Sequence, residues 1–225
     1  MELWREAYSR WLKIHQAVSA PRAPTTSLSA STAKTGNGSA DCHDFGADLL
    51  RSDGAPKSSG APSLSFFLSP GDRVTLHSDG CCFPSRVGGW GVIIESPALR
   101  RPLRGHGAIS RTTNNRAELL AVINGLEQIT VPCNVQIIGD SKYVVEGISH
   151  GLAKWKSQGW RTGSGRHKRD LKNLDLWQRL DALIQVHQSV VCRWVPGHSG
   201  HAENEACDQL AQLAARQLEH RLGSR

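Results

Sequence analysis

The alternation of apolar and polar positions predicts an α/β domain in the second two thirds of the chain. Short apolar runs typical of strands lie at Arg73–Ser78, Trp90–Glu95, Arg104–Ser110, Asn134–Ile138 and Val190–Val195. Apolar residues at helical spacing predict helices over Asn115–Gln128, Ser141–Ile148, Leu171–His187 and Glu203–Leu222. Three successive strands followed by alternating helices and strands indicate a mixed sheet with helices packed on its faces.

The first 70 residues follow a different pattern. Apolar positions within residues 1–18 are compatible with a short helix. From Ala17 to Ala40, 19 of 24 residues are Ser, Thr, Ala, Pro or Gly, and such a segment buries too little apolar surface to offset its ordering entropy. We therefore predict an N-terminal extension over residues 1–70, a short helix followed by a disordered linker, and a folded α/β domain over residues 71–225.

The charge distribution favours a polyanionic partner. The net charge is +7, and residues 71–225 carry 20 Lys or Arg against 14 Asp or Glu, whereas residues 1–70 carry 7 against 6. No apolar run approaches the roughly 20 residues needed to span a bilayer, so we expect no membrane-spanning segment. A cytoplasmic location and a monomeric state are our default expectations. None of the six cysteines forms a C-x-x-C pair, and the cysteines therefore give a zinc site little support.

Four acidic residues occupy positions where α/β proteins often place a site. Asp79 and Asp140 each follow a predicted strand, and strand ends open into a crevice. Glu118 and Asp208 fall in the first turns of predicted helices. A carboxylate there is also favourable beside the helix dipole, so either residue taken alone is weak evidence of function.

Five blocks of sequence are more specific than any single residue. They are HSDGCC (77–82), RTTNNRAEL (111–119), GDSKYV (139–144), KNLDLWQRLD (172–181) and WVPGHSGHAENEACDQLA (194–211). In this order and spacing the chain resembles type 1 ribonuclease H over about residues 71–220. The resemblance implies a ribonuclease H-like fold, a five-stranded mixed sheet with helices on both faces. It also implies an endonuclease that hydrolyses the RNA strand of RNA–DNA hybrids and leaves 5′-phosphate and 3′-hydroxyl ends.

The resemblance also implies which residues carry the chemistry. The catalytic carboxylates would be Asp79, Glu118, Asp140 and Asp208, holding two Mg²⁺ ions, with Mn²⁺ as a possible substitute. Asp79 would bridge both ions, Glu118 and Asp140 would hold one, and Asp208 the other. His198 matches the family's mobile histidine near the site, although a structural loop histidine is the alternative. For His201 we prefer a structural role.

Two regions are predicted to hold the hybrid. Thr113, Asn114 and Asn115 precede Glu118 and would meet the substrate backbone and bases, although Asn114 could equally cap the helix. A basic segment follows between residues 154 and 172, and although most charged runs are only solvated faces, this one contains interleaved tryptophans. Its candidate contacts are Lys154, Trp155, Lys156, Trp160, Arg161, Lys168 and Arg169. We expect Trp177 and Trp194 to belong to the core.

Two alternatives use the same fold. One is a non-catalytic module that binds hybrids, and the other is a DNA-cutting nuclease of the transposase kind. Four intact carboxylates argue against the first, because a surface that only binds a polyanion benefits from losing negative charge. The TTNNRAE and GHSGH blocks argue against the second. The loop after Asp79, CCFPSRVGG, differs from the glycine-rich loop common in bacterial ribonucleases H, so an asparagine contact to phosphate is missing there.

Overall fold

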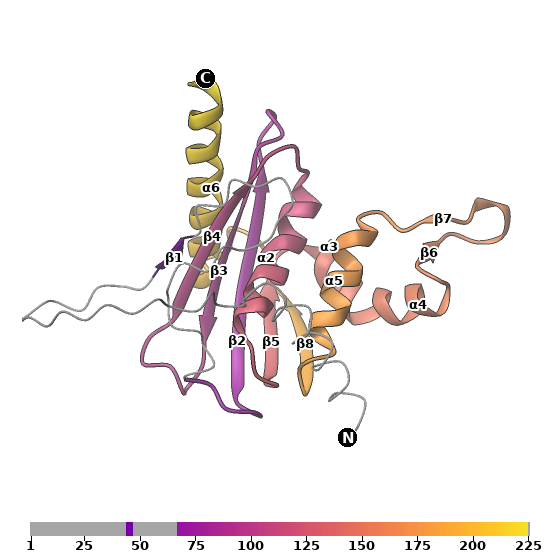
Figure 1. Ribbon diagram of the computed structural model, residues 1–225, viewed down its shortest axis with the longest axis horizontal. Helices are drawn as coiled ribbons and strands as arrows, with labels where there is room; N and C mark the ends of the chain where they lie inside the picture. Colours follow the sequence, from indigo (N-terminus) through magenta and orange to yellow (C-terminus); the bar gives the residue numbers. More distant parts are fainter. Residues whose placement is uncertain (1–43, 47–66, 225) are drawn as a thin grey trace, which may run out of the picture. The chain divides into compact units, whose positions relative to one another are not determined.

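The computed structural model describes residues 44–46 and 67–224 (Figure 1). The short helix predicted within residues 1–18 and most of the predicted linker lie outside these residues. Within the described chain, no helix combines the length and apolar character needed to cross a membrane.

The main sheet is mixed, as predicted, and its strands follow the order β1-β4-β3-β2-β5-β8. Three antiparallel strands come first, β2 (Arg73–Cys82), β3 (Gly88–Glu95) and β4 (Leu103–Ile109). Next come β5 (Asn134–Gly139) and β8 (Ser189–Trp194), which extend the sheet parallel to β2. The predicted five strands are confirmed. A sixth, β1 (Asp44–Gly46), pairs parallel with β4 and lies in a segment where the sequence predicted no strand.

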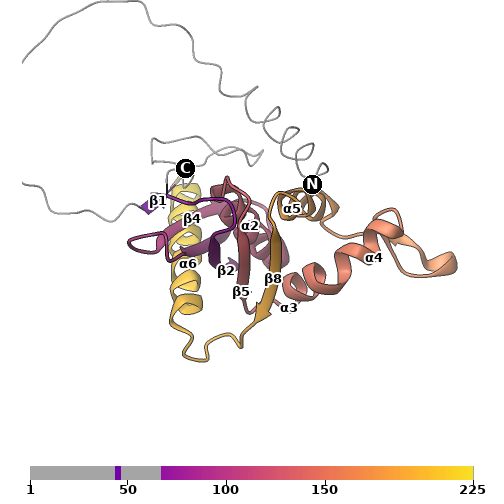
Figure 2. The same ribbon diagram turned by 90° about the horizontal axis from the view of Figure 1, so that it is seen from below.

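Helices cover both faces of the sheet, as predicted (Figures 1 and 2). One face carries α2 (Asn114–Gln128), which packs against α5 (Leu174–Ile184), and the other carries α6 (Ala202–Gly223). Gly89 and Gly91 of β3 explain the close approach of α6, because a side chain at either position would overlap its backbone carbonyls. Trp90, Val92 and Ile94 alternate with these glycines and enter the main core.

A helical path leads from β5 to a small projection. It runs through α3 (Lys142–Glu146), the π-helical turn η2 (Gly147–Gly151) and α4 (Leu152–Ser157), where the sequence predicted one helix ending at Ile148. The chain then forms a hairpin of β6 (Arg161–Thr162) and β7 (Arg169–Asp170), with the 3₁₀ turn η3 (Gly165–His167) between them. Both views show this segment extending away from the main sheet (Figures 1 and 2).

The folded domain begins before the predicted boundary at residue 71. Leu68 is 4% exposed and belongs to the main core. The Cys133 thiol donates a hydrogen bond to the Ser69 carbonyl, 3.8 Å away. Leu68 therefore packs in the core of the domain, and Ser69 contacts the loop before β5.

Candidate active site

Three of the four predicted catalytic carboxylates converge at one end of the sheet. Candidate ligand oxygens of Asp79, Glu118 and Asp140 all lie within 4.8 Å of one another. Asp79 lies within β2 opposite Gly91, so the prediction that it follows the strand is wrong. The strand β5 ends at Gly139, whereas β2 continues to Cys82. Asp140, the residue after β5, therefore lies beside Asp79 of β2.

Gly80 brings the third carboxylate into place. Glu118 lies in the first turns of α2, and a side chain at Gly80 would overlap the Glu118 backbone nitrogen and the Ala117 carbonyl. A glycine here lets α2 press its N-terminal end against β2. Glu118 is the fifth residue of α2 and lies just beyond its first turn, so the predicted first-turn position is wrong by one residue. The side chain is 6% exposed.

Asp208 flanks this group. It lies in α6 and is half-buried, and both of its carboxylate oxygens accept hydrogen bonds from Gln212 Nε2 at 2.9 Å. Its negative charge contributes to raising the pKa of both Asp79 and Glu118. Asp208 therefore acts electrostatically on Asp79 and Glu118, although it lies outside the group of three carboxylates.

Burial and like charge shift the pKa values of the two innermost carboxylates. Burial, followed by the charge of Asp140, raises the pKa of Asp79 to about 7, although the Gly80 N–H donates a hydrogen bond to Asp79 Oδ1 at 2.7 Å. Burial, followed by the charges of Asp79 and Asp140, raises the pKa of Glu118 to about 9. Such a group is destabilised when fully ionised. A hard divalent cation with oxygen ligands would offset this repulsion, and the residues present fit it.

The loop that carries His198 runs against Asp140. The Trp194 Nε1–H donates to the Asp140 carbonyl at 2.9 Å, and a side chain at Gly197 would overlap the Asp140 carboxylate. His198 itself is exposed, with a positive φ of 51°. Trp194 is 41% exposed, so the prediction that it belongs to the core is wrong. Its indole lies beside Asp140 and beneath the Lys142 ammonium instead of entering the core. The same prediction for Trp177 is confirmed.

The residues predicted to meet the hybrid minor groove lie at the start of α2. Thr113, Asn114 and Asn115 are exposed and line a shallow groove together with Lys172 and Asn173. Thr113, rather than Asn114, occupies the N-cap position of α2, and its side chain makes no capping hydrogen bond. The capping role considered for Asn114 is therefore not observed.

The basic segment divides into exposed and packed residues. Lys154, Arg161, Lys168 and Arg169 are exposed on α4 and the β6–β7 hairpin. Lys156 Nζ lies 2.9 Å from Asp181 Oδ2. Trp155 packs edge-on against Trp177 with ring centroids 4.9 Å apart, and Trp160 is partly buried against the core. These two tryptophans anchor the base of the projection, a role that the sequence interpretation missed.

Arg116 has a structural role that the sequence analysis also missed. Its guanidinium donates to both Asp175 oxygens at 2.9 and 2.7 Å, joining the start of α2 to the start of α5 beside Glu118. The pair is 59 residues apart in sequence, so neither helical spacing nor a local motif could have revealed it.

The family model for RNase H matches residues 71–216. This match covers more than half of the chain, including all four acids and His198. The chain belongs to the RNase H family. A ribonuclease H of Rhodopseudomonas palustris (strain TIE-1) is 47% identical over 140 residues, which are 62% of this chain and 86% of that relative. A ribonuclease H of strain HaA2 is 46% identical over 153 residues, 67% of this chain and 91% of the relative.

Solved structures agree with this assignment. The structure of LC9-RNase H1, described as a type 1 RNase H with the type 2 active-site motif, matches with a TM-score of 0.58 and 32% identity, covering 66% of this chain and 74% of that one. An RNase H domain from Mycobacterium tuberculosis, 24% identical with a TM-score of 0.53 over 67% of this chain and 99% of the other, supports the fold alone. The predicted family, fold and enzyme class, a nuclease for the RNA strand of RNA–DNA hybrids, are confirmed.

Proposed function

We propose that this RNase H hydrolyses the RNA strand by a two-metal-ion mechanism, with Asp79, Glu118, Asp140 and Asp208 as ligands of Mg²⁺. The carrying observation is the convergence of three carboxylates from β2, α2 and the end of β5 within 4.8 Å, two of them buried. Ions bound there would activate the attacking water and stabilise the leaving 3′-oxygen. The products would carry 5′-phosphate and 3′-hydroxyl ends. Mn²⁺ is the substitute whose oxygen-ligand chemistry fits the same residues.

Each carboxylate has a separate place in this proposal. Asp79 would contact both ions, as the family resemblance implies. Glu118 and Asp140 would hold one ion, and Asp208 the other. His198 would accept or release a proton near the departing product, since its loop is fixed against Asp140 by Gly197.

The hybrid would lie across the start of α2. Thr113, Asn114 and Asn115 would face its minor groove, where 2′-hydroxyls distinguish RNA from DNA. The projecting segment would contact phosphates of the DNA strand through Lys154, Arg161, Lys168 and Arg169, which are exposed. Trp155, Trp160 and Lys156 would act indirectly, by holding this segment in place. A monomeric state and a cytoplasmic location stay predictions.

The test is cleavage of an end-labelled RNA–DNA hybrid, compared with RNA duplex, DNA duplex and single-stranded RNA. With Mg²⁺ we expect cutting of the RNA strand of the hybrid alone, and none with chelator. Glu118→Gln and Asp140→Asn should abolish cutting, whereas Glu146→Gln, on the exposed surface of α3, should leave it unchanged.

Two outcomes would contradict the proposal. Binding of the hybrid without cleavage, under both Mg²⁺ and Mn²⁺, would make the chain a binding module. Cutting of the DNA duplex would indicate a transposase-like nuclease.

A further inference from the structure

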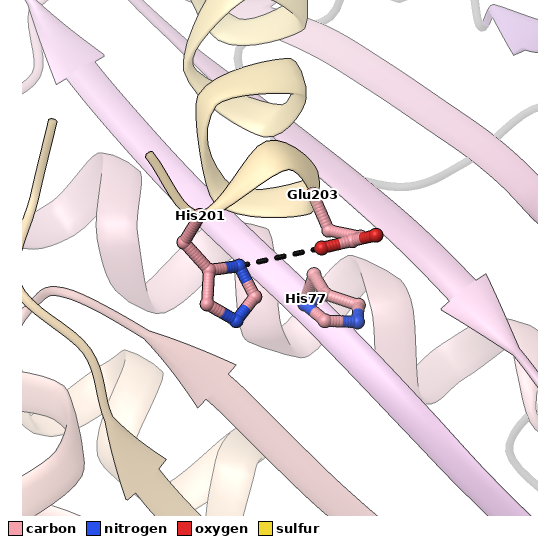
Figure 3. Close-up of side chains that lie close together, drawn as sticks. All are labelled: His77, His201 and Glu203. Carbon is pink, nitrogen blue, oxygen red and sulfur yellow. Dashed lines mark ion pairs between the residues drawn. The ribbon is translucent and has the colours of Figure 1, made fainter. Parts of the chain in front are cut away.

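A second cluster of metal-ligating side chains lies beside the carboxylates on the same face of β2. His77 of β2, His201 before α6 and Glu203 in its first turn each offer a ligand atom, and these atoms lie within 4.8 Å of one another (Figure 3). None of the three belongs to the proposed catalytic group. The sequence analysis assigned His201 only a structural role and did not consider His77.

The cluster contains buried nitrogen atoms without hydrogen-bond partners. His77 is 3% exposed, and its Nδ1 makes no hydrogen bond in the structure. His201 Nδ1 is likewise buried without a hydrogen bond, although Glu203 Oε2 lies 3.4 Å away. The two rings have centroids 5.6 Å apart and face the Glu203 carboxylate (Figure 3). Buried polar atoms are seldom left unpaired in native proteins, and a bound ion is one way in which such atoms are satisfied.

The other nitrogen of His77 already has a partner. Its Nε2 lies 3.2 Å from Glu95 Oε2 on the neighbouring strand β3. A metal-bound histidine commonly donates its second ring N–H to a carboxylate, which fixes the tautomer and leaves the opposite nitrogen free to bind. With the proton on Nε2, the lone pair of His77 Nδ1 is available to a cation.

We propose that His77, His201 and Glu203 bind a Zn²⁺ ion, with water in the fourth position and Glu95 as the positioning residue for His77. Zn²⁺ takes imidazole and carboxylate ligands at about 2.0–2.2 Å in a tetrahedron, which places neighbouring ligand atoms about 3.3–3.6 Å apart. The separation of 3.4 Å between His201 Nδ1 and Glu203 Oε2 meets this requirement. Two imidazoles favour Zn²⁺ over Mg²⁺, which prefers oxygen ligands.

The site would join β2 to the start of α6. His77 precedes Asp79 by two residues, so the two side chains share one face of the strand. His201 closes the loop that carries His198, and α6 continues to Asp208. A bound Zn²⁺ therefore holds the framework of the proposed catalytic site without taking part in its chemistry. The inference stands independently of the proposed mechanism.

The test is Zn²⁺ binding by the full chain, measured by equilibrium dialysis in the presence of excess Mg²⁺. We expect the unaltered protein to retain one equivalent more than His201→Ala. Glu203→Gln should weaken this binding by at least about 10-fold, and Glu95→Gln by about 10-fold, as for other groups that orient a ligand. Glu205→Gln is the matched control, because it removes the same charge two residues further along α6, where Glu205 Oε1 accepts only the Gly200 N–H.

Co²⁺ provides a readout that does not depend on stoichiometry. We expect the visible absorption of tetrahedral Co²⁺ in the unaltered protein and its loss in His201→Ala, a variant chosen because this side chain is about a quarter exposed. Circular dichroism would confirm that the variant is folded. Failure to retain Zn²⁺, or equal retention by His201→Ala, would overturn the proposal. The second result would assign the metal to the cysteine thiols or to the carboxylate group.

Discussion

In the metal-free protein, the raised pKa of the Asp79 carboxyl lowers the stability of the folded state. Its pKa is about 7 when folded, against an ordinary value of 3.8, chiefly because of burial. Below about pH 4 the carboxyl is protonated in both the folded and unfolded states, so it contributes no difference. As the pH rises from about 4 to about 7, the unfolded state ionises while the folded state stays protonated, and stability is lost. Above about pH 7 the carboxyl is ionised in both states, and the loss stays constant.

Asp79→Asn should therefore stabilise the chain in chelator while abolishing cleavage. We expect the free energy of unfolding at pH 8 to rise by about 1–3 kcal/mol, and little change at pH 4. Thermal unfolding at both pH values measures this. Mg²⁺ should narrow the difference, because only the unaltered carboxylate gains from the ion. If Asp79→Asn were less stable than the unaltered protein at pH 8, the buried Asp79 carboxylate would not destabilise the fold as argued.

At the scale of secondary-structure elements, Gly80 determines how closely α2 approaches β2. Gly80→Ala would place a methyl group against the backbone of Ala117 and Glu118, which cannot move independently of the helix. We expect a loss of about 1–3 kcal/mol in the free energy of unfolding and a larger proportional loss of kcat, because Glu118 shifts with α2. Gly223→Ala, where nothing lies within 4 Å, is the control and should be neutral. Unchanged kcat in Gly80→Ala would show that the site tolerates displacement of α2.

The projecting hairpin should act on affinity and leave the chemical step unchanged. We expect Lys168→Ala and Arg169→Ala to raise KM for the hybrid with little change in kcat, because both side chains are exposed and away from the carboxylates. Each should reduce the slope of log affinity against log salt by about 1. Arg73→Ala, at the first residue of β2 and six residues before Asp79, is the control. An unchanged salt slope would remove the hairpin from the substrate interface.

Helices and strands with a regular pattern of apolar residues could be predicted from the sequence. Features that depend on contacts between distant segments could not. The strands β2 to β5 and the helix α2 follow from alternation and helical spacing, since burial of one face imposes the pattern. Extension of β2 past Asp79 depends on pairing with Gly88–Gly91 of β3. The projection depends on Trp155 packing against Trp177.

The same distinction applies to the sites. The proposed catalytic acids could be named from the sequence because they sit in motifs that resemble a known family, and three of them lie together in the structure. The cluster of His77, His201 and Glu203 could not, because the fold alone brings β2 and the start of α6 together. Neither local spacing nor composition carries that information.

For the whole molecule, the position of Leu68 determines where the chain can be shortened. Removal of residues 1–66 keeps Leu68, whereas removal of residues 1–70 deletes it together with Ser69, whose carbonyl accepts a hydrogen bond from Cys133. We expect the shorter protein to be less stable by about 2 kcal/mol, the contribution of one buried leucine. Urea unfolding of both truncations measures the difference, and both should cleave the hybrid at low temperature. Equal stability would show that Leu68 contributes no net free energy.

Asp79 comes from the first long strand and Asp208 from the last helix. This separation affects when activity can recover during refolding. Contacts between distant parts of a chain form slowly, because the intervening loop must first be closed. A partly refolded molecule with the sheet and α2 in place would still lack Asp208 beside Asp79. Hydrolysis should thus recover no earlier than the docking of α6 onto Gly89 and Gly91. On the proposed mechanism, the chain therefore cuts no nucleic acid before α6 has docked.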